Sequence, residues 1–296
     1  MERTAGEPML ALPGPEHGAV DFARGGFEVC GKPVLVAPEG GQGRGTAWDV
    51  WDGAYRLAQW LERASEKDAF KFALPSLASD APRNDDSPPM VIELGSGTGL
   101  GGLAARASFP ETDVTLTDLP EAMDALKENI KLNAHLIKAH GLPRLRALPL
   151  DWTTTLTGSL PLHIAPAGYD LVLAADCVWL MELIPAFVRT LRAVTHARSL
   201  VLLAYQERSR SASRALFGTL DAYFTLEDAE GFLLRLEDEE HGRPPRGDEH
   251  VEHGASAVRL YILRRRVTSV EHPLPKLRRP SLVSVDRALI EEGAAW

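Results

Sequence analysis

Residues 90–102, with the sequence MVIELGSGTGLGG, join a short apolar run to a glycine-rich turn. The apolar run is typical of a parallel strand that is covered on both faces of its sheet. Gly95, Gly97 and Gly99 allow the backbone to turn sharply and to approach a ligand closely, because glycine has no Cβ. The helix expected to begin near Leu100 adds free N–H groups at its first turn, which suit a polar or anionic group. This stretch predicts a site for a nucleotide cofactor.

The spacing of the glycines is compatible with two classes of cofactor. Gly97, Gly99 and Gly102 fit the G-x-G-x-x-G fingerprint of dinucleotide-binding folds, and Asp118 lies about twenty residues further on, where a carboxylate binds ribose hydroxyls. Glu93, however, precedes the first glycine and completes the pattern E-L-G-x-G-x-G. This pattern resembles the first motif of the class I, seven-β-strand S-adenosylmethionine-dependent methyltransferases. In that family the glycine loop lies under the methionine part of the cofactor rather than under a pyrophosphate.

Composition and charge limit the class of protein. A chain of 296 residues with 45% apolar and 25% charged residues fits a soluble α/β domain with additions. The net charge of −9 argues against a protein that coats nucleic acid, because such binding neutralises phosphates. Nucleic acid is therefore not expected as a partner, and the substrate is expected to carry basic groups.

Further features bear on the compartment and on metals. The chain has no apolar run of membrane-spanning length, and its first residues lack the features of a signal peptide. No membrane partner is expected, and the expected location is the cytoplasm, with the nucleus as the alternative. Cys30 and Cys177 form neither a disulfide framework nor a Cys-x-x-Cys pair. His241, His250 and His253 lie in an acidic, proline-bearing loop, so no metal site is predicted.

Strands and helices are expected to alternate through the middle of the chain. Apolar runs predict strands at residues 90–94, 113–117, 144–150, 169–175 and 199–205. Helical spacing predicts helices from 51 to about 62–65, from 100, from 120 to Gly141, at 183–194 and at 213–221. A hairpin is expected at 27–36, and strands at 231–236 and 258–263 are expected to form an antiparallel hairpin. This order predicts a doubly wound, mostly parallel, seven-stranded Rossmann-like α/β sheet with an antiparallel C-terminal hairpin and a small N-terminal β/α extension.

The chain is expected to divide into four parts. Residues 1–65 form a leader, a β-ribbon and a helix that covers the cofactor, and the stretch 1–18, rich in Pro and Gly, is expected to be loose. Residues 66–89 form a polar, proline-bearing, mobile linker. Residues 90–264 form the methyltransferase core, and residues 265–296 form a basic tail.

Five stretches carry a more specific resemblance. They are VWDGAYRLAQWLE, VIELGSGTGLGG, VTLTDLPEAMDALKENIKLN, LDW and YDLVLAADCVW, in the order and spacing of the methyltransferase-like, non-histone protein-lysine N-methyltransferases. The resemblance implies S-adenosyl-L-methionine as the cofactor and a lysine side-chain amine of a protein as the methyl acceptor. The cofactor-binding residues that it implies are Trp51, Glu93, Gly95, Gly97, Gly99, Asp118, Asp151, Trp152 and Ala175. Asp118 would accept the ribose hydroxyls, and Asp151 with Trp152 would bracket the adenine.

The resemblance also implies an acceptor site formed by Asp176, Trp179 and Tyr205. Asp176 and Trp179 occupy the family's acidic-x-x-aromatic motif, with Trp where many members have Tyr or Phe. Methyl transfer from a sulfonium is an in-line displacement, so catalysis depends on holding donor and acceptor in line where water is excluded. A lysine must react as the neutral amine, and a desolvated aromatic pocket lowers its pKa. Trp179 and Tyr205 would supply this pocket, while Asp176 orients the amine.

Three alternatives to protein-lysine methylation stay open from the sequence. A methyltransferase of this fold could act on a small-molecule or nucleic-acid amine, although residues 176–179 lack the prolines of the Asp/Asn-Pro-Pro-aromatic motif. An NAD-dependent oxidoreductase would use the glycine loop for a pyrophosphate, but it would not need Asp151, Trp152 and Asp176. A binding module without catalysis would keep the cofactor fold. Cys177 is expected to be a small buried residue and not a nucleophile.

Overall fold

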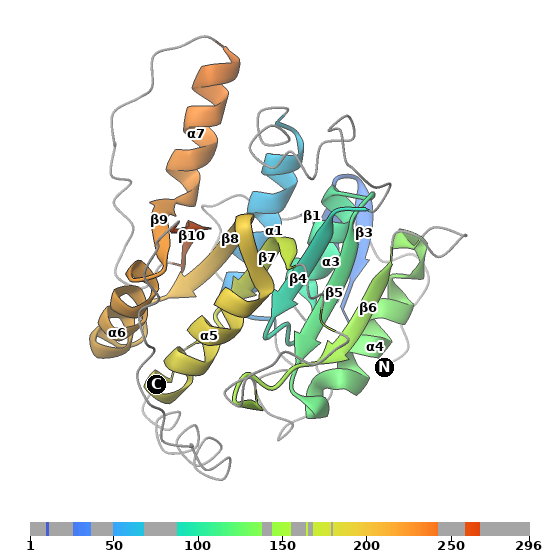
Figure 1. Cartoon of the computed structure of the whole chain (residues 1–296). Coiled ribbons are helices and arrows are strands. Elements are labelled where there is room, and N and C mark those ends of the chain that lie inside the picture. Colours follow the sequence, from blue (N-terminus) through green and yellow to red (C-terminus); the bar gives the residue numbers. More distant parts are fainter. Residues whose placement is uncertain are drawn as a thin grey trace.

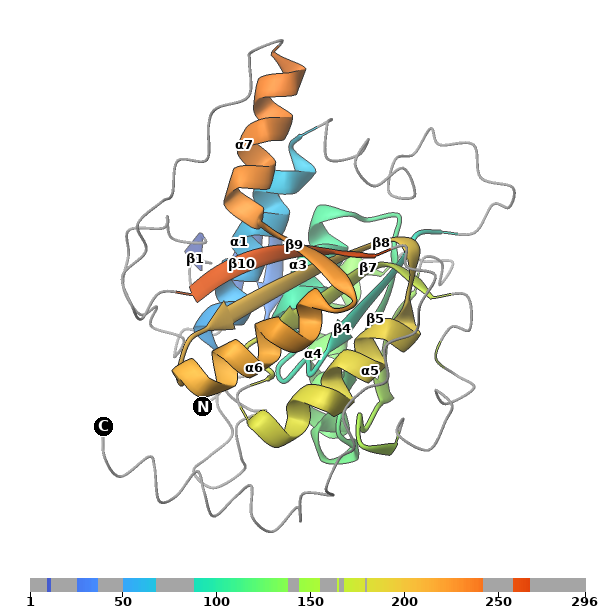
Figure 2. The same ribbon diagram turned by 60° about the vertical axis from the view of Figure 1, so that its left-hand side comes forward.

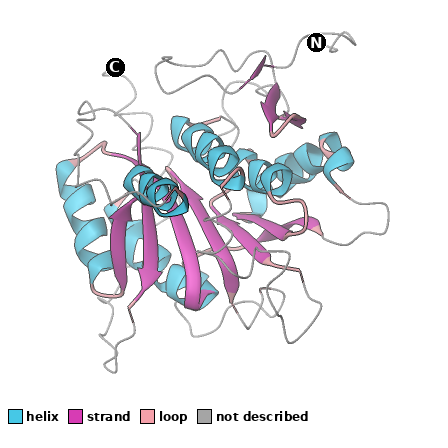
Figure 3. Ribbon diagram, turned by 90° about the horizontal axis from the view of Figure 1, so that it is seen from above, coloured by secondary structure: helices cyan, strands magenta, loops and turns pink. Residues whose placement is uncertain are grey.

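The computed structural model describes residues 10–11, 26–36, 50–67, 88–137, 144–154, 164, 168–178, 180–241 and 258–266. The centre of the molecule is a seven-stranded sheet with helices on both faces (Figures 1 and 3). The strand order is β6-β5-β4-β7-β8-β10-β9. The strands are β4 (Met90–Leu94), β5 (Asp113–Asp118), β6 (Leu145–Pro149), β7 (Tyr169–Ala175), β8 (Thr195–Gln206), β9 (Phe224–Asp228) and β10 (Val258–Arg265).

The strands from β6 to β8 are parallel, and β10 is antiparallel to both β8 and β9. Parallel pairing requires crossover connections, and the helices provide them. Both faces of the sheet are buried. On β8, for example, Leu202 belongs to one apolar cluster, whereas Val201 and Leu203 belong to the other. The predicted doubly wound, mostly parallel fold is confirmed.

The helices divide between the two faces of the sheet, and Figure 2 shows α5 and α6 in front of it. The helices of one face are α1 (Asp52–Ser65), α3 (Leu100–Ser108), α4 (Met123–Leu132) and α7 (Ala229–Glu240). The other face carries α5 (Ile184–Val194) and α6 (Arg210–Asp221). Short 3-10 turns form η3 (Pro120–Ala122), η4 (Ala134–Leu136) and η6 (Met181–Leu183). No helix in these described ranges is long and apolar enough to cross a bilayer.

The predicted N-terminal hairpin is confirmed. β2 (Gly26–Val29) and β3 (Lys32–Leu35) pair antiparallel. The two residues between them, Cys30 and Gly31, have φ values of 50° and 69°. Positive φ at both loop positions is what the tightest hairpin turns require. β1 (Leu10–Ala11) pairs in parallel with β2. The rest of the stretch 1–18, which is expected to be loose, lies outside the described residues.

The prediction of a strand at 231–236 is wrong, because these residues lie in α7. The buried side chains Ala229, Phe232, Leu233 and Leu236 recur at helical spacing and pack against the α1 face of the sheet. The indole N–H of Trp60 on α1 donates to the carbonyl of Ala229 at 3.0 Å. The partner of β10 is instead β9, which precedes α7.

The helix predicted from 120 to Gly141 is shorter in the structure, because α4 ends at Leu132. The next residue, Asn133, is fully buried. Its side-chain oxygen accepts the Leu35 N–H at 2.8 Å, and its amide donates to the Leu35 carbonyl at 2.6 Å. An asparagine side chain that bonds to backbone favours a helix end over a helix interior. The chain then continues as η4.

Candidate active site

The strand order changes direction between β4 and β7, since β5 and β6 lie on one side and β8 on the other. In doubly wound sheets, ligands bind at this switch point, outside the carboxyl ends of the strands. Most of the site residues predicted from the sequence lie at, or just after, the carboxyl ends of β4, β5, β6 and β7. They are Gly95, Gly97, Gly99, Asp118, Asp151, Trp152, Ala175 and Asp176.

The glycine loop after β4 has a backbone that only glycine adopts freely. Gly95, Gly97 and Gly99 have φ values of 63°, 51° and 82°. A Cβ on Gly95 would lie 2.6 Å from the Cβ of Cys177, and one on Gly99 would lie 2.9 Å from a methyl group of Leu116. The loop therefore has no room for a larger residue at Gly95 or Gly99.

Glu93 supports this loop from beneath. Its side chain is almost fully buried, and Oε2 accepts the Gly102 N–H at the start of α3 at 3.0 Å. A Cβ on Gly101 would collide with Oε1. Burial raises the pKa of Glu93 to about 8, against the opposing effect of the N–H group that Gly102 donates. The carboxyl is thus directed at α3, and its direct contact with a cofactor stays a prediction.

Asp118 holds the glycine loop from the side. Its Oδ2 accepts the Gly97 N–H at 2.8 Å, and its Oδ1 accepts the Leu119 N–H at 2.7 Å. Burial raises the pKa of Asp118, and these two hydrogen bonds oppose the rise. Ser96 adds two links to β5, because its N–H donates to the Thr117 carbonyl and its hydroxyl accepts the Thr117 N–H, both at 2.9 Å.

Asp151 and Trp152 follow β6, as predicted. Asp151 Oδ1 accepts the backbone N–H and the hydroxyl of Thr153, at 2.8 and 2.7 Å. The Trp152 ring packs edge-on against Phe187, with 5.3 Å between the ring centroids. A Cβ on Gly95 would lie 3.3 Å from this indole. The structure therefore brings Trp152 to the glycine loop.

Asp176 joins three segments at the end of β7. It has a φ of 49°, which is unusual for a residue with a side chain. Its Oδ1 accepts the Gln206 N–H from the end of β8 at 2.8 Å, and its Oδ2 accepts the Gly53 N–H from the start of α1 at 3.0 Å. A Cβ on Gly53 would lie 2.6 Å from Oδ2. Burial raises the pKa of Asp176, while these N–H groups and Arg208 oppose the rise.

Trp51 immediately precedes α1, at the point that Asp176 fixes. The guanidinium of Arg208 lies 4.9 Å from the centre of its ring, within the range of a cation–π contact. Trp51 is half-buried, so part of its ring remains accessible. Asp176 thus places Trp51 beside the carboxyl edge of the sheet.

The side chain of Tyr205 is buried and bonds to α6, so it differs from the other predicted site residues. Tyr205 is 6% exposed and belongs to the apolar cluster on the α6 face. Its hydroxyl bonds to the Ser213 hydroxyl at 2.8 Å, and its ring packs against Phe217. Trp179 lies outside the described residues. The catalytic roles of both residues stay predictions.

Cys177 behaves as expected for a small packed residue. It contributes to the cluster around β7, and burial raises the pKa of its thiol. A thiol that resists ionisation is a poor nucleophile.

Sequence reasoning missed two residues of this site. Gly53 has no side chain to suggest a function, and its signal was only a glycine at the start of a helix, next to Trp51. Arg208 follows the strand predicted at 199–205, and a single arginine at that place has no motif of its own. Their roles depend on contacts that form only in the folded chain: Gly53 bonds to Asp176, and Arg208 lies over the ring of Trp51.

Comparisons with known proteins agree with this geometry. The profile of the lysine methyltransferase family matches residues 32–222. EEF1A lysine methyltransferase 3 of Mus musculus is 30% identical over 205 residues, which are 69% of this chain and 75% of that protein. Protein-lysine N-methyltransferase EFM6 of Saccharomyces cerevisiae is 30% identical over 234 residues, 75% of this chain and 88% of that protein. Protein N-lysine methyltransferase METTL21A of Danio rerio is 32% identical over 173 residues, 58% of this chain and 66% of that protein. The chain therefore belongs to the lysine methyltransferase family and is an S-adenosylmethionine-dependent protein-lysine methyltransferase.

Proposed function

We propose that the loops after β4, β5 and β6 bind S-adenosyl-L-methionine and that Asp176 presents a lysine of a substrate protein to it. The observation that carries the proposal is the loop after β4, whose three glycines have positive φ and whose Gly95 has no room for a Cβ. Such a loop offers bare backbone to a ligand. It lies at the switch point of the sheet, where nucleotides bind.

The residues on this side of the site fit the cofactor. When bound, S-adenosyl-L-methionine supplies an electrophilic methyl group on a sulfonium. The two oxygens of Asp118 each accept one N–H, and a carboxylate has about four lone-pair sites, so acceptors remain for ribose hydroxyls. Trp152, fixed by Phe187, offers an aromatic surface beside the loop for the adenine. Glu93 keeps the loop in shape by holding the first turn of α3.

Asp176 is suited to orient the acceptor amine. Its backbone partners fix the carboxylate in place and leave lone pairs on both oxygens. A lysine arrives as an ammonium and must lose its proton before its lone pair can attack. Removal from water lowers the pKa of an ammonium, and the Trp51 ring beside Asp176 helps to exclude water. We propose, from the family resemblance of the sequence, that Trp179 and Tyr205 form the aromatic wall around the acceptor lysine.

The substrate is proposed to be a lysine of a cytoplasmic protein, with EEF1A as the first candidate. One relative is named for the methylation of EEF1A lysine. The net charge of −9 suits a substrate surface with basic groups. Both cysteines are free, which fits a reducing compartment, and the nucleus is the alternative.

The test is methyl transfer to purified EEF1A. The protein is incubated with S-adenosyl-L-methionine carrying a labelled methyl group, and modified lysines are located by mass spectrometry. We expect label on a lysine of EEF1A, or of another protein when a cell lysate is added. Label found only in nucleic acid or in small amines would contradict the proposal.

A further inference from the structure

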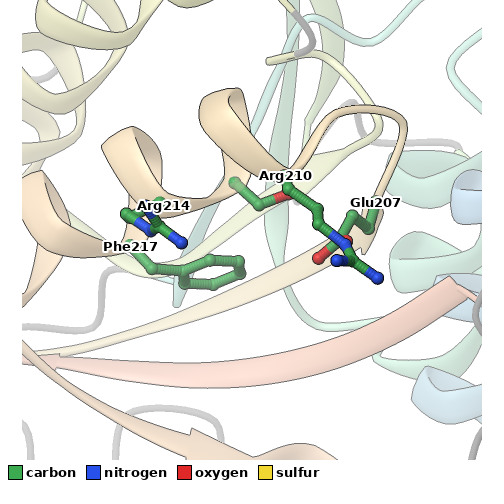
Figure 4. Close-up of a pocket in the computed structure, with 5 residues that line it drawn as sticks. Glu207, Arg210, Arg214 and Phe217 are labelled. Carbon is green, nitrogen blue, oxygen red and sulfur yellow. The ribbon is translucent and has the colours of Figure 1, made fainter.

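An open pocket is formed by α6 and by the turn between β8 and α6 (Figure 4). It has a volume of about 350 Å³ and is lined by Glu207, Arg210, Ser213, Arg214 and Phe217. Glu207 directly follows Gln206, whose N–H donates to Asp176. Ser213 bonds to the hydroxyl of Tyr205. The pocket is thus linked to the proposed acceptor site in two ways. Glu207 is bonded in sequence to Gln206, which contacts Asp176, and Ser213 is hydrogen-bonded to Tyr205.

The pocket combines an aromatic floor with exposed, charged side chains around it. The Phe217 ring packs against the rings of Tyr205 and Tyr261, with centroid distances of 5.3 and 4.9 Å. Arg210 and Arg214 lie one turn apart on α6, and both are exposed. Figure 4 shows both guanidinium groups projecting from α6 near Phe217 and Glu207. An aromatic floor under long cationic side chains suits a small anionic group with an apolar stem.

The charge of the pocket defines its occupant. In the described part of the chain, neither Arg210 nor Arg214 forms an ion pair with a carboxylate. A guanidinium binds a carboxylate through two parallel hydrogen bonds. Glu207 lines the same pocket, so two guanidinium groups and one carboxylate leave a net charge of about one positive unit. This charge matches one carboxylate better than the run of phosphates in a nucleic acid.

We propose that this pocket binds an acidic side chain of the substrate protein close to the target lysine, and that it thereby selects the lysine to be methylated. The inference rests on the proposed function, because it assigns the substrate class of the same site. The acidic residue anchors the substrate on α6 while Asp176 receives the lysine at the end of β7. In a chain with a net charge of −9, an acidic segment is repelled elsewhere and attracted here.

The experiment measures peptide binding without turnover. Two fluorescein-labelled peptides share a central lysine and differ only in neighbouring glutamates or glutamines. Their affinities are measured by fluorescence anisotropy in the presence of S-adenosylhomocysteine, for the unmodified protein, for the double variant Arg210→Ala/Arg214→Ala and for Arg198→Ala. Arg198 is an exposed arginine near the amino end of β8, at the opposite edge of the sheet, and serves as the matched control.

We expect the glutamate peptide to bind about fivefold to tenfold more tightly than the glutamine peptide, with a difference that shrinks as salt is added. The double variant should abolish this preference, and Arg198→Ala should keep it. Equal binding of the two peptides, or a preference that survives in the double variant, overturns the proposal. Tighter binding of single-stranded oligothymidylate through the same two arginines overturns it in favour of nucleic acid. Calorimetric binding of S-adenosylhomocysteine to the double variant checks its fold, and methyl transfer to EEF1A reports separately on the proposed function.

Discussion

The two halves of the carboxyl edge of this sheet are built differently. Around β4 and β5, the buried Glu93 and the half-buried Asp118 fix the main chain through hydrogen bonds to backbone N–H groups. Around the end of β8, most side chains are exposed and charged, such as Glu207 and Arg210. Asp176 is held in place there by the N–H of Gln206. A cofactor has one shape, whereas protein substrates differ. Substitutions in the first half should therefore impair cofactor binding. Substitutions in the second half should alter the choice of substrate without unfolding the protein.

The largest effect is expected from Gly95→Ala, in the rigid half. The new Cβ would lie 2.6 Å from that of Cys177, at a φ of 63°, and such overlap and strain together cost about 3 kcal/mol. We expect the affinity for S-adenosylhomocysteine, measured by calorimetry, to fall by about a hundredfold. Gly218→Ala on α6 is the control, because a Cβ there meets no atom within 4 Å. Unchanged affinity in Gly95→Ala would show that the loop is not rigid.

The next effect is expected from Asp118→Ala. The change removes a carboxylate that accepts the Gly97 N–H and that we assign to the ribose hydroxyls. A lost hydrogen bond to a charged group costs about 1.5–3 kcal/mol, so the affinity for S-adenosylhomocysteine should fall by about ten- to a hundredfold. Thermal unfolding of the cofactor-free variant separates loss of binding from loss of fold. Native affinity would remove Asp118 from the cofactor site.

Asp176→Asn distinguishes the two halves. The amide keeps one oxygen for a backbone N–H but loses the charge that we assign to the lysine amine. We expect methyl transfer to slow by about tenfold or more, with the affinity for S-adenosylhomocysteine kept within about threefold. If both quantities fell equally, Asp176 would act through the cofactor half instead.

Glu93→Gln should change the pH dependence of folding. In the folded state burial raises the pKa of Glu93 from its ordinary 4.5 to about 8. Between these values the unfolded chain has lost the proton and the folded chain still holds it, so stability falls as pH rises, by on the order of 1 kcal/mol per pH unit from this group. Glutamine cannot ionise and should remove this slope in urea unfolding of the cofactor-free protein. Parallel curves for both proteins between pH 5 and pH 8 would show that Glu93 titrates normally.

The sequence predicted those parts of the molecule that depend on local patterns. The apolar run before Gly95 forms β4, Asp118 is the last residue of β5, and Asp176 directly follows β7. Neighbouring strand ends meet at one edge of a parallel sheet, so these positions could be predicted to lie together. Residues 231–236 were assigned to a strand, because a short apolar run does not distinguish strand from helix. The four-residue spacing from Ala229 to Leu233 would have indicated α7.

Contacts between distant segments could not be predicted in this way. Gly53 and Asp176 lie 123 residues apart, and nothing in either neighbourhood specifies their hydrogen bond. Likewise, the family resemblance implied a place for Tyr205 in the acceptor wall, but its hydroxyl bonds to Ser213 on α6. Side-chain direction at a strand end depends on the whole sheet and not on residue type alone.

The most direct test of the account is a calorimetric titration of the purified protein with S-adenosyl-L-methionine, S-adenosylhomocysteine and, separately, NAD. We expect the first two to bind, NAD not to bind, and Gly95→Ala to weaken the binding by about a hundredfold while Gly218→Ala preserves it. Binding of NAD alone would mean that the glycine loop holds a pyrophosphate, and it would contradict the assignment of this site.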